Sequence, residues 1–169
     1  MDKRNERCFY CSGDVRFRRA IMEIRELKSE DLKSLLELYV QLDENNKNLS
    51  VEDSSILWNE KIEQSQNIKY FGAVEDGKVV STCYAVIIPN LTNFNKSICF
   101  IENVVTDKNF RNQGLAKKVI QKAVDFAKAN NCYKVILQSG IARTEAHKFY
   151  EKIGFNGNSK KAFDMRLEN

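Results

Sequence analysis

The chain has 169 residues, of which 43% are hydrophobic and 30% charged, and its formal net charge is +4. This length fits one domain with a substantial core, and the composition excludes a disordered or fibrous protein. No apolar run approaches the roughly 18 residues that cross a bilayer, and the charged N-terminus does not lead into a secretory signal, so we expect a cytoplasmic protein.

The first 21 residues carry an excess of Lys and Arg and show neither the period of a strand nor that of a helix. We therefore expect a basic, flexible N-terminal extension at 1–21 and a folded domain at 22–169. The rest of the chain is almost neutral and lacks the basic excess that marks nucleic-acid-binding domains. We expect neither a nucleic acid nor a membrane as a partner.

The five cysteines do not indicate a disulfide framework. Cys8 and Cys11 have the C-x-x-C spacing of a metal or redox pair. No second such pair follows, and the single histidine, His147, is far away in the sequence. We predict no metal site.

The domain is predicted to begin with an alternating strand at residues 22–27. Ser29 is expected to cap a first helix, which ends at the polar stretch 43–46. A second helix is predicted over about residues 50–64, because apolar side chains recur there at helical spacing.

Three strands follow these helices. Residues 68–75 and 79–88 flank Asp76-Gly77, a strong signal for a β-hairpin turn. A third, largely apolar strand is predicted at 98–105.

The C-terminal part is predicted to alternate between helices and strands. Helices are expected at 114–130 and 144–153, the second of them stopped by Gly154 in a left-handed conformation. Strands are expected at 133–137 and 162–167. The element order predicts a single three-layer α/β domain, a mixed sheet with helices on both faces.

The loop that joins the strand at 98–105 to the helix at 114–130 is chemically the most informative segment. The first turn of a helix leaves main-chain N–H groups free, and these groups bind anions. Gly114 allows close approach to the main chain, and Arg111 and Lys117 add positive charge. Neither the P-loop pattern nor the dinucleotide-binding pattern is present. The loop suits a pyrophosphate.

Two motifs in this part of the chain resemble those of one superfamily. Arg111-x-x-Gly114-x-Ala116 is similar to the [QR]-x-x-G-x-[GA] loop of the GNAT superfamily of N-acetyltransferases. The segment YEKIGF at residues 150–155 resembles the signature that follows the next helix in the same superfamily. The resemblance covers about residues 22–167.

The resemblance implies the GNAT (acyl-CoA N-acyltransferase) fold and acetyl-CoA as the cosubstrate, with no metal. It implies that Tyr150 protonates the departing thiolate and that the N–H of Val105 binds the oxyanion. The residues that it assigns to acetyl-CoA are Val104, Val105, Arg111, Asn112, Gln113, Gly114, Leu115, Ala116 and Lys117.

Glu102 is the candidate base, because it interrupts an apolar strand. It lies two residues before Val104, so both side chains are expected on the same face. Its carboxylate could accept the amine proton or attract the ammonium group; the alternative is an acidic residue on a solvent face. Tyr150 has the alternative of a buried core aromatic. Arg143 could hold an anionic group of the substrate or a phosphate of CoA, and its alternative is a surface residue at the start of a helix.

The predicted function is transfer of the acetyl group from acetyl-CoA to a primary amine of a small molecule by direct attack in a ternary complex. Segments 101–105 and 132–137 resemble those of small-amine and amino-sugar-phosphate acetyltransferases. A protein acetyltransferase acting on lysine or an N-terminus is the first alternative, and a non-catalytic acetyl-CoA-binding module is the second. Resembling proteins also suggest a homodimer.

Overall fold

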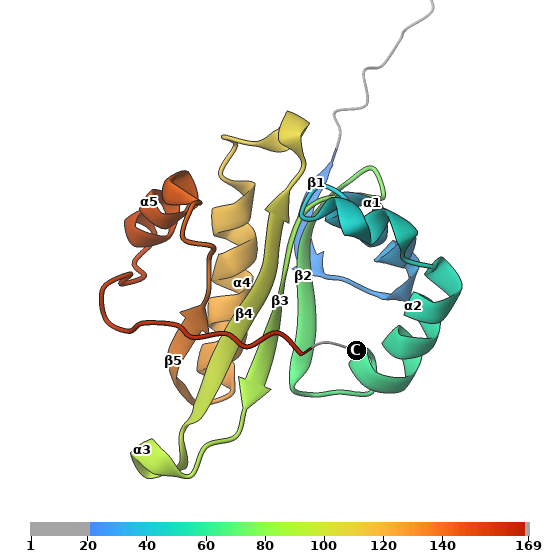
Figure 1. Cartoon of the computed structure of the whole chain (residues 1–169). Coiled ribbons are helices and arrows are strands. Elements are labelled where there is room, and N and C mark those ends of the chain that lie inside the picture. Colours follow the sequence, from blue (N-terminus) through green and yellow to red (C-terminus); the bar gives the residue numbers. More distant parts are fainter. Residues whose placement is uncertain (1–20, 168–169) are drawn as a thin grey trace, which may run out of the picture.

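A five-stranded sheet forms the centre of the computed structural model, which describes residues 21–167 (Figure 1). The strands follow one another across the sheet in chain order: β1 (Met22–Glu26), β2 (Ile68–Glu75), β3 (Lys78–Ile88), β4 (Ser97–Thr106) and β5 (Cys132–Leu137). All neighbours are antiparallel except β4 and β5, which are parallel. The predicted extension, apart from Ile21, lies outside the described residues, as do Cys8 and Cys11.

Helices cover both faces of the sheet, which confirms the predicted three-layer architecture (Figure 1). Helix α4 (Leu115–Ala129) packs on one face, and α1 (Leu32–Tyr39) and α2 (Val51–Leu57) lie on the other. Helix α5 (Thr144–Lys152) lies beyond the C-terminal end of β5. The shorter helical segments are Ser29–Asp31, Glu44–Asn48, Trp58–Ile62, α3 (Thr92–Asn95) and Lys108–Phe110.

The core is divided by the sheet into two clusters. One, on the α4 side, contains Ile101 and Val119; the other, on the α1 side, contains Leu35 and Trp58. Within residues 21–167, no helix has both the length and the apolar character needed to cross a membrane.

The start of α1 differs from the prediction that Ser29 caps it. A short helical turn comes first, and the carboxylate of Asp31 accepts the main-chain N–H of Lys28 at 2.9 Å. The guanidinium of Arg25 donates two bonds to the same carboxylate, at 2.6 and 2.8 Å. Burial alone would raise the pKa of Asp31, but these bonds hold it below its ordinary value. The buried ion pair fixes α1 against β1.

The hairpin between β2 and β3 forms as predicted, with Glu75 opposite Lys78. Asp76 and Gly77 both have positive φ, 48° and 79°, as the tightest hairpin turns require.

Strand β4 contains a bulge where it pairs with β3. Asn103 and Val104 together stand opposite the single residue Cys83. Asn103 has a φ of 52°, in the left-handed region that asparagine tolerates better than most residues. The extra residue reverses the alternation of side chains along the rest of the strand.

The bulge overturns the expectation that Glu102 and Val104 share a face. Glu102 stands opposite Tyr84, whose ring stacks on Tyr70 on the α1 side of the sheet. Val104 instead packs against the cluster on the α4 side, while Val105 joins the cluster on the α1 side.

Strands β4 and β5 separate soon after they pair. Their last paired residues are Ile101 and Leu137, although β4 continues to Thr106. The edge of β4 beyond Ile101 is therefore left open on the side of β5, as expected for two strands that splay apart.

The predicted strand at 162–167 is wrong, because these residues form no strand in the structure. The segment keeps an alternating pattern, yet its apolar members Phe163, Met165 and Leu167 are 84%, 86% and 84% exposed. A strand needs a partner to hydrogen-bond, and this segment pairs with none of the described strands.

Candidate active site

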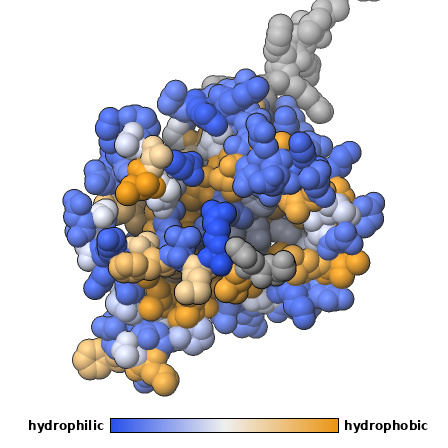
Figure 2. Space-filling view, viewed as in Figure 1, coloured by the Kyte–Doolittle hydropathy of each residue, from blue (hydrophilic) through white to orange (hydrophobic). Residues whose placement is uncertain are grey.

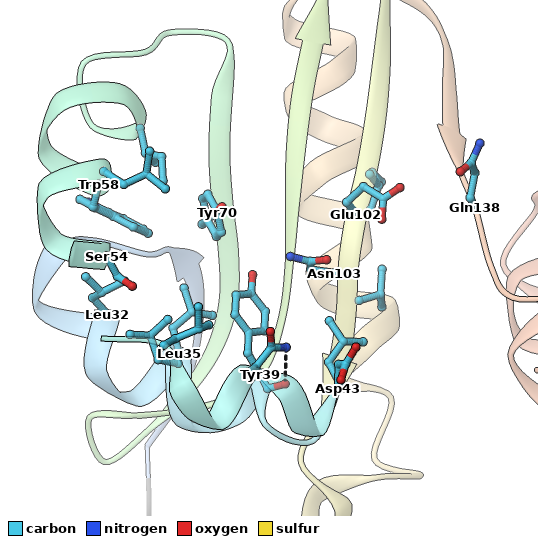
Figure 3. Close-up of a pocket in the computed structure, with 18 of the residues that line it drawn as sticks. Leu32, Leu35, Tyr39, Asp43, Ser54, Trp58, Tyr70, Glu102, Asn103 and Gln138 are labelled. Carbon is cyan, nitrogen blue, oxygen red and sulfur yellow. Dashed lines mark hydrogen bonds between the residues drawn. The ribbon is translucent and has the colours of Figure 1, made fainter. Parts of the chain in front are cut away.

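A cavity of about 540 Å³ opens between the α1–α2 layer and β4, at the point where β4 leaves β5 (Figure 3). Its lining combines apolar residues of α1 and α2 with a small set of polar side chains, which include Asp43, Glu102, Asn103, Arg143 and Tyr150. Apolar side chains are visible inside a hollow with a mostly hydrophilic rim on this side of the molecule (Figure 2). The arrangement is typical of a small-molecule site.

Tyr150 reaches this cavity from α5. Its ring packs against those of Phe149 and Phe155, at centroid distances of 5.3 and 6.1 Å. Its hydroxyl makes no hydrogen bond within residues 21–167. Burial raises the pKa of Tyr150, and the nearby Arg143 partly opposes this shift. The phenol is therefore protonated at neutral pH and free to donate.

Glu102 lines the same cavity from β4. Its carboxylate is half-buried and forms no ion pair with any described residue. Burial raises the pKa of Glu102, against a hydrogen bond from the main chain of Asn103. A partly desolvated carboxylate without a cation can accept a proton or hold an ammonium group. The structure thus brings Glu102 and Tyr150 to one cavity.

The loop before α4 presents unpaired main-chain donors. No described residue accepts a hydrogen bond from the N–H groups of residues 112–117. Asn112 and Gly114 have positive φ, 61° and 74°, and Arg111 is held by a bond from its Nε to the carbonyl of Thr106 at 3.3 Å. A Cβ placed at Gly114 would meet nothing within 4 Å. The space beside these donors is therefore open, and the loop fits a pyrophosphate.

Asp107 anchors the base of this loop. Its carboxylate accepts the N–H of Asn109 at 2.8 Å and the side-chain amide of Gln41 at 3.0 Å. Gln41 also accepts the N–H of Lys108 at 3.0 Å, which ties the loop to the chain after α1. Burial would raise the pKa of Asp107, but these bonds lower it. The loop before α4 is thus held in place by hydrogen bonds within the protein.

The open edge of β4 presents main-chain groups to the same region. The N–H of Asp107 donates to the carbonyl of Val80 at 2.8 Å, which fixes the alternation of hydrogen-bonded pairs along the β3–β4 ladder. In that alternation the N–H and C=O groups of Val105 point toward β3. The same groups of Val104 and Thr106 point away from β3, toward the edge of β4 that β5 no longer covers. The geometry favours Val104 over Val105 as a donor to a ligand in the opening.

Arg143 and His147 lie in different surroundings. Arg143 lines the cavity and is close enough to Tyr150 to oppose part of the rise that burial causes in the pKa of Tyr150. The Nε2 atom of His147 lies 3.0 Å from the carbonyl of Gly140, so this histidine braces the loop before α5. No group of His, Cys, Asp and Glu side chains that could hold a metal ion occurs in the described part of the chain.

Sequence reasoning missed the contribution of Tyr39 and Asn103 to the cavity. Tyr39 has the spacing of a core residue, and nothing in the sequence shows that its side chain lines a cavity. Asn103 does carry a signal, because an asparagine inside an apolar strand is a candidate for a left-handed bulge residue.

Comparison with known proteins gives one consistent family. The sequence model described as "Acetyltransferase (GNAT) family" matches residues 32–155. A glucosamine 6-phosphate N-acetyltransferase of Trypanosoma brucei brucei is 32% identical over 149 residues, which are 87% of this chain and 95% of the relative.

Solved structures agree with this match. A putative acetyltransferase from Agrobacterium tumefaciens has a TM-score of 0.80 and 35% identity, over 86% of this chain and 99% of that chain. The glucosamine-6-phosphate N-acetyltransferase of Arabidopsis thaliana has a TM-score of 0.72 and 28% identity, over 88% and 98% of the two chains.

Proposed function

This chain belongs to the GNAT family of acetyltransferases, and from that premise we propose that it transfers the acetyl group of acetyl-CoA to a primary amine of a small molecule. The observation that carries the proposal is the cavity shared by Glu102 and Tyr150, which lies beside the open edge of β4. The acceptor attacks directly in a ternary complex in the cytoplasm.

The loop and the strand edge position the donor. The free N–H groups of residues 112–117, with the positive end of the α4 dipole, bind the pyrophosphate. Arg111 and Lys117 add charge at the same place. The open edge of β4 at Val104 pairs with the pantetheine arm and directs the thioester to the cavity. There the N–H of Val104 donates a hydrogen bond to the thioester carbonyl oxygen and stabilises the negative charge that develops on it.

Glu102 and Tyr150 move the protons. The acceptor enters as an ammonium ion, since alkylamines have a pKa near 10, and Glu102 takes its proton directly or through water. The nitrogen then forms a bond to the acetyl carbon as the carbon–sulfur bond breaks. Tyr150 donates its proton to the departing sulfur. The second proton that the nitrogen must lose then passes, directly or through water, to the Tyr150 phenolate, and Glu102 releases its proton to solvent.

The shape of the cavity favours a small acceptor over a protein. Helices α1 and α2 wall one side, and their apolar side chains leave a recess suited to a compact molecule. The named relatives from Trypanosoma and Arabidopsis act on an amino sugar phosphate, which is also small. Tyr150 and Glu102 in one cavity also disfavour a non-catalytic binding module.

A thiol-release assay with acetyl-CoA and a panel of amines tests this function. The panel holds glucosamine, its 6-phosphate, cyclohexylamine, an aminophosphonate, a polyamine, an aminoglycoside and a lysine peptide. We expect turnover with at least one small amine and an acetylated product by mass spectrometry. Release with the peptide alone would support the protein acetyltransferase, and no release at all would leave the binding module.

We also propose a homodimer in which two copies complete each other's sheets. Among the described strands β5 pairs only with β4, and its Val135 and Leu137 are only partly buried. The C-terminal segment alternates as a strand does, with Phe163, Met165 and Leu167 exposed. Because this segment does not cover its own β5, the strand of a second copy fits that edge and would bury these side chains.

A further inference from the structure

The side chain of Gln41 connects the wall of the cavity to the loop before α4. Gln41 follows α1, and its Nε2 donates to the carboxylate of Asp107 at 3.0 Å, while its Oε1 accepts the N–H of Lys108 at 3.0 Å. No other described side chain of the α1–α2 layer forms a hydrogen bond with residues 107–114. One glutamine therefore makes the polar connection between the two halves of the proposed site.

The chemistry of this junction suits an amide. Asp107 is only 4% exposed and forms no ion pair with a described residue, so among the described side chains only Gln41 donates to its carboxylate. The N–H of Lys108 needs an acceptor at the same place. A lysine at position 41 could only donate and a glutamate could only accept, whereas the amide of glutamine does both.

Ser34 shows how a different polar contact of α1 is used. Its Oγ accepts the N–H of Val79 on β3 at 2.7 Å. This contact holds the middle of α1 on the sheet and reaches no part of the loop. Gln41 instead bonds to the base of the loop, a few residues before the free N–H groups of residues 112–117.

The two residues that follow Gln41 belong to the wall of the cavity. Leu42 and Asp43 both line it, and their main-chain N–H groups both donate to the carbonyl of Tyr39, at 3.0 and 3.1 Å. In the close-up, Tyr39 and Asp43 lie on the same side of the cavity (Figure 3). A shift of Gln41 therefore carries this part of the wall with it.

We propose that Gln41 is a positioning residue that couples the binding of acetyl-CoA to the shape of the acceptor cavity. Its two hydrogen bonds hold the loop in the form that presents its N–H groups to the pyrophosphate, and they fix Leu42 and Asp43 when the loop is occupied. The inference rests on the proposed function, because it takes acetyl-CoA as the ligand of the loop. Gln41 moves no proton.

The variant Gln41→Ala tests the proposal by removing both bonds. Its Kd for acetyl-CoA in isothermal titration calorimetry should rise about tenfold, because binding must then order a loop that is no longer held in advance. Ser34→Ala is the matched control, since it also removes a hydrogen bond that attaches α1 to the rest of the domain. Both variants should lose some thermal stability, but Ser34→Ala should keep its affinity for acetyl-CoA.

Reversing the polarity of the pair distinguishes positioning from a general loss of stability. Gln41→Glu alone places two carboxylates together and removes the donor, so it should weaken acetyl-CoA binding at least as much as Gln41→Ala. In the double variant with Asp107→Asn, the amide at position 107 can donate to the carboxylate at position 41. That carboxylate can still accept the N–H of Lys108. The double variant should bind acetyl-CoA within about threefold of the unaltered protein.

Amide NMR spectra show whether the effect reaches the cavity wall. On titration of the unaltered protein and of Ser34→Ala with acetyl-CoA, the amides of Leu42 and Asp43 should shift. In Gln41→Ala at saturating acetyl-CoA, these two shifts should be lost while those of residues 112–117 remain. Shifts of Leu42 and Asp43 that persist in Gln41→Ala would arise from direct contact with the ligand and would refute the coupling.

Two calorimetric results would also overturn the role of Gln41 alone: an unchanged Kd for Gln41→Ala, or an equal rise in Kd for Ser34→Ala. A double variant that binds no better than Gln41→Glu would refute the hydrogen-bond geometry as the cause. If the unaltered protein did not bind acetyl-CoA at all, the proposed function would fail, and the role of Gln41 with it.

Discussion

Replacing Gly114 by alanine distinguishes the contribution of this glycine to stability from its proposed contribution to acetyl-CoA binding. Gly114 has a φ of 74°, a conformation that costs an alanine about 1–2 kcal/mol. The added Cβ meets no protein atom within 4 Å, so no steric cost within the protein is expected. For a domain of this size the melting temperature should fall by about 2–8 °C.

The effect on acetyl-CoA should be much larger than this strain suggests. The methyl group occupies the open space beside the N–H groups of residues 112–117, where the pyrophosphate is proposed to bind. Loss of one charge-assisted hydrogen bond, about 1.5–3 kcal/mol, weakens the Kd by about 10- to 150-fold. Isothermal titration calorimetry with acetyl-CoA measures this change.

Gly77→Ala is the matched control for this experiment. Gly77 has a similar φ of 79°, and its Cβ would also meet nothing within 4 Å, but it lies in the β2–β3 turn. This variant should lose a similar amount of stability and keep its affinity for acetyl-CoA. Equal affinities of the two variants would refute the assignment of the loop.

Three further outcomes follow from the site and the sheet edge. Tyr150→Phe should lower kcat about 100-fold in the thiol-release assay, as expected for loss of a general acid, with little change in the Kd for acetyl-CoA; an unchanged kcat would remove Tyr150 from the chemistry. Glu102 must be ionised to accept a proton, and burial raises its pKa, so activity should fall as the pH is lowered through a value above that of an ordinary glutamate. Glu102→Gln should abolish that limb of the pH profile, and its persistence in the variant would exclude Glu102 as the base. Light scattering should show a dimer, and the double variant Phe163→Asp with Met165→Asp should be a folded monomer; a monomeric unaltered protein would contradict the exchanged strand.

The sequence was sufficient where local chemistry decides the structure. Asp76-Gly77 forms the predicted turn, because aspartate and glycine both tolerate the positive φ that the type I′ hairpin turn requires at its two central residues. Gly154 ends α5 with a φ of 106°, as predicted. The loop before α4 could be identified because its glycine and its free amides are properties of the loop itself.

The features that the sequence did not reveal depend on residues distant in the chain. Asp31 anchors the start of α1 in place of Ser29 because Arg25 on β1 pairs with it. The bulge at Asn103 is a property of the pairing between β4 and β3, which the sequence does not show. Simple alternation therefore placed the side chains of Glu102 and Val104 on the same face of the sheet, which is wrong. The segment at 162–167, predicted as a strand, pairs with no described strand although one edge of β5 is open, so its alternating pattern alone did not decide its structure.

Amide NMR spectra recorded during titration with acetyl-CoA test the central claim most directly. We expect the largest shifts at the N–H groups of residues 112–117 and at Val104, with the Gly77 amide unchanged. Shifts confined to another part of the chain, with these amides unaffected, would contradict the proposed site.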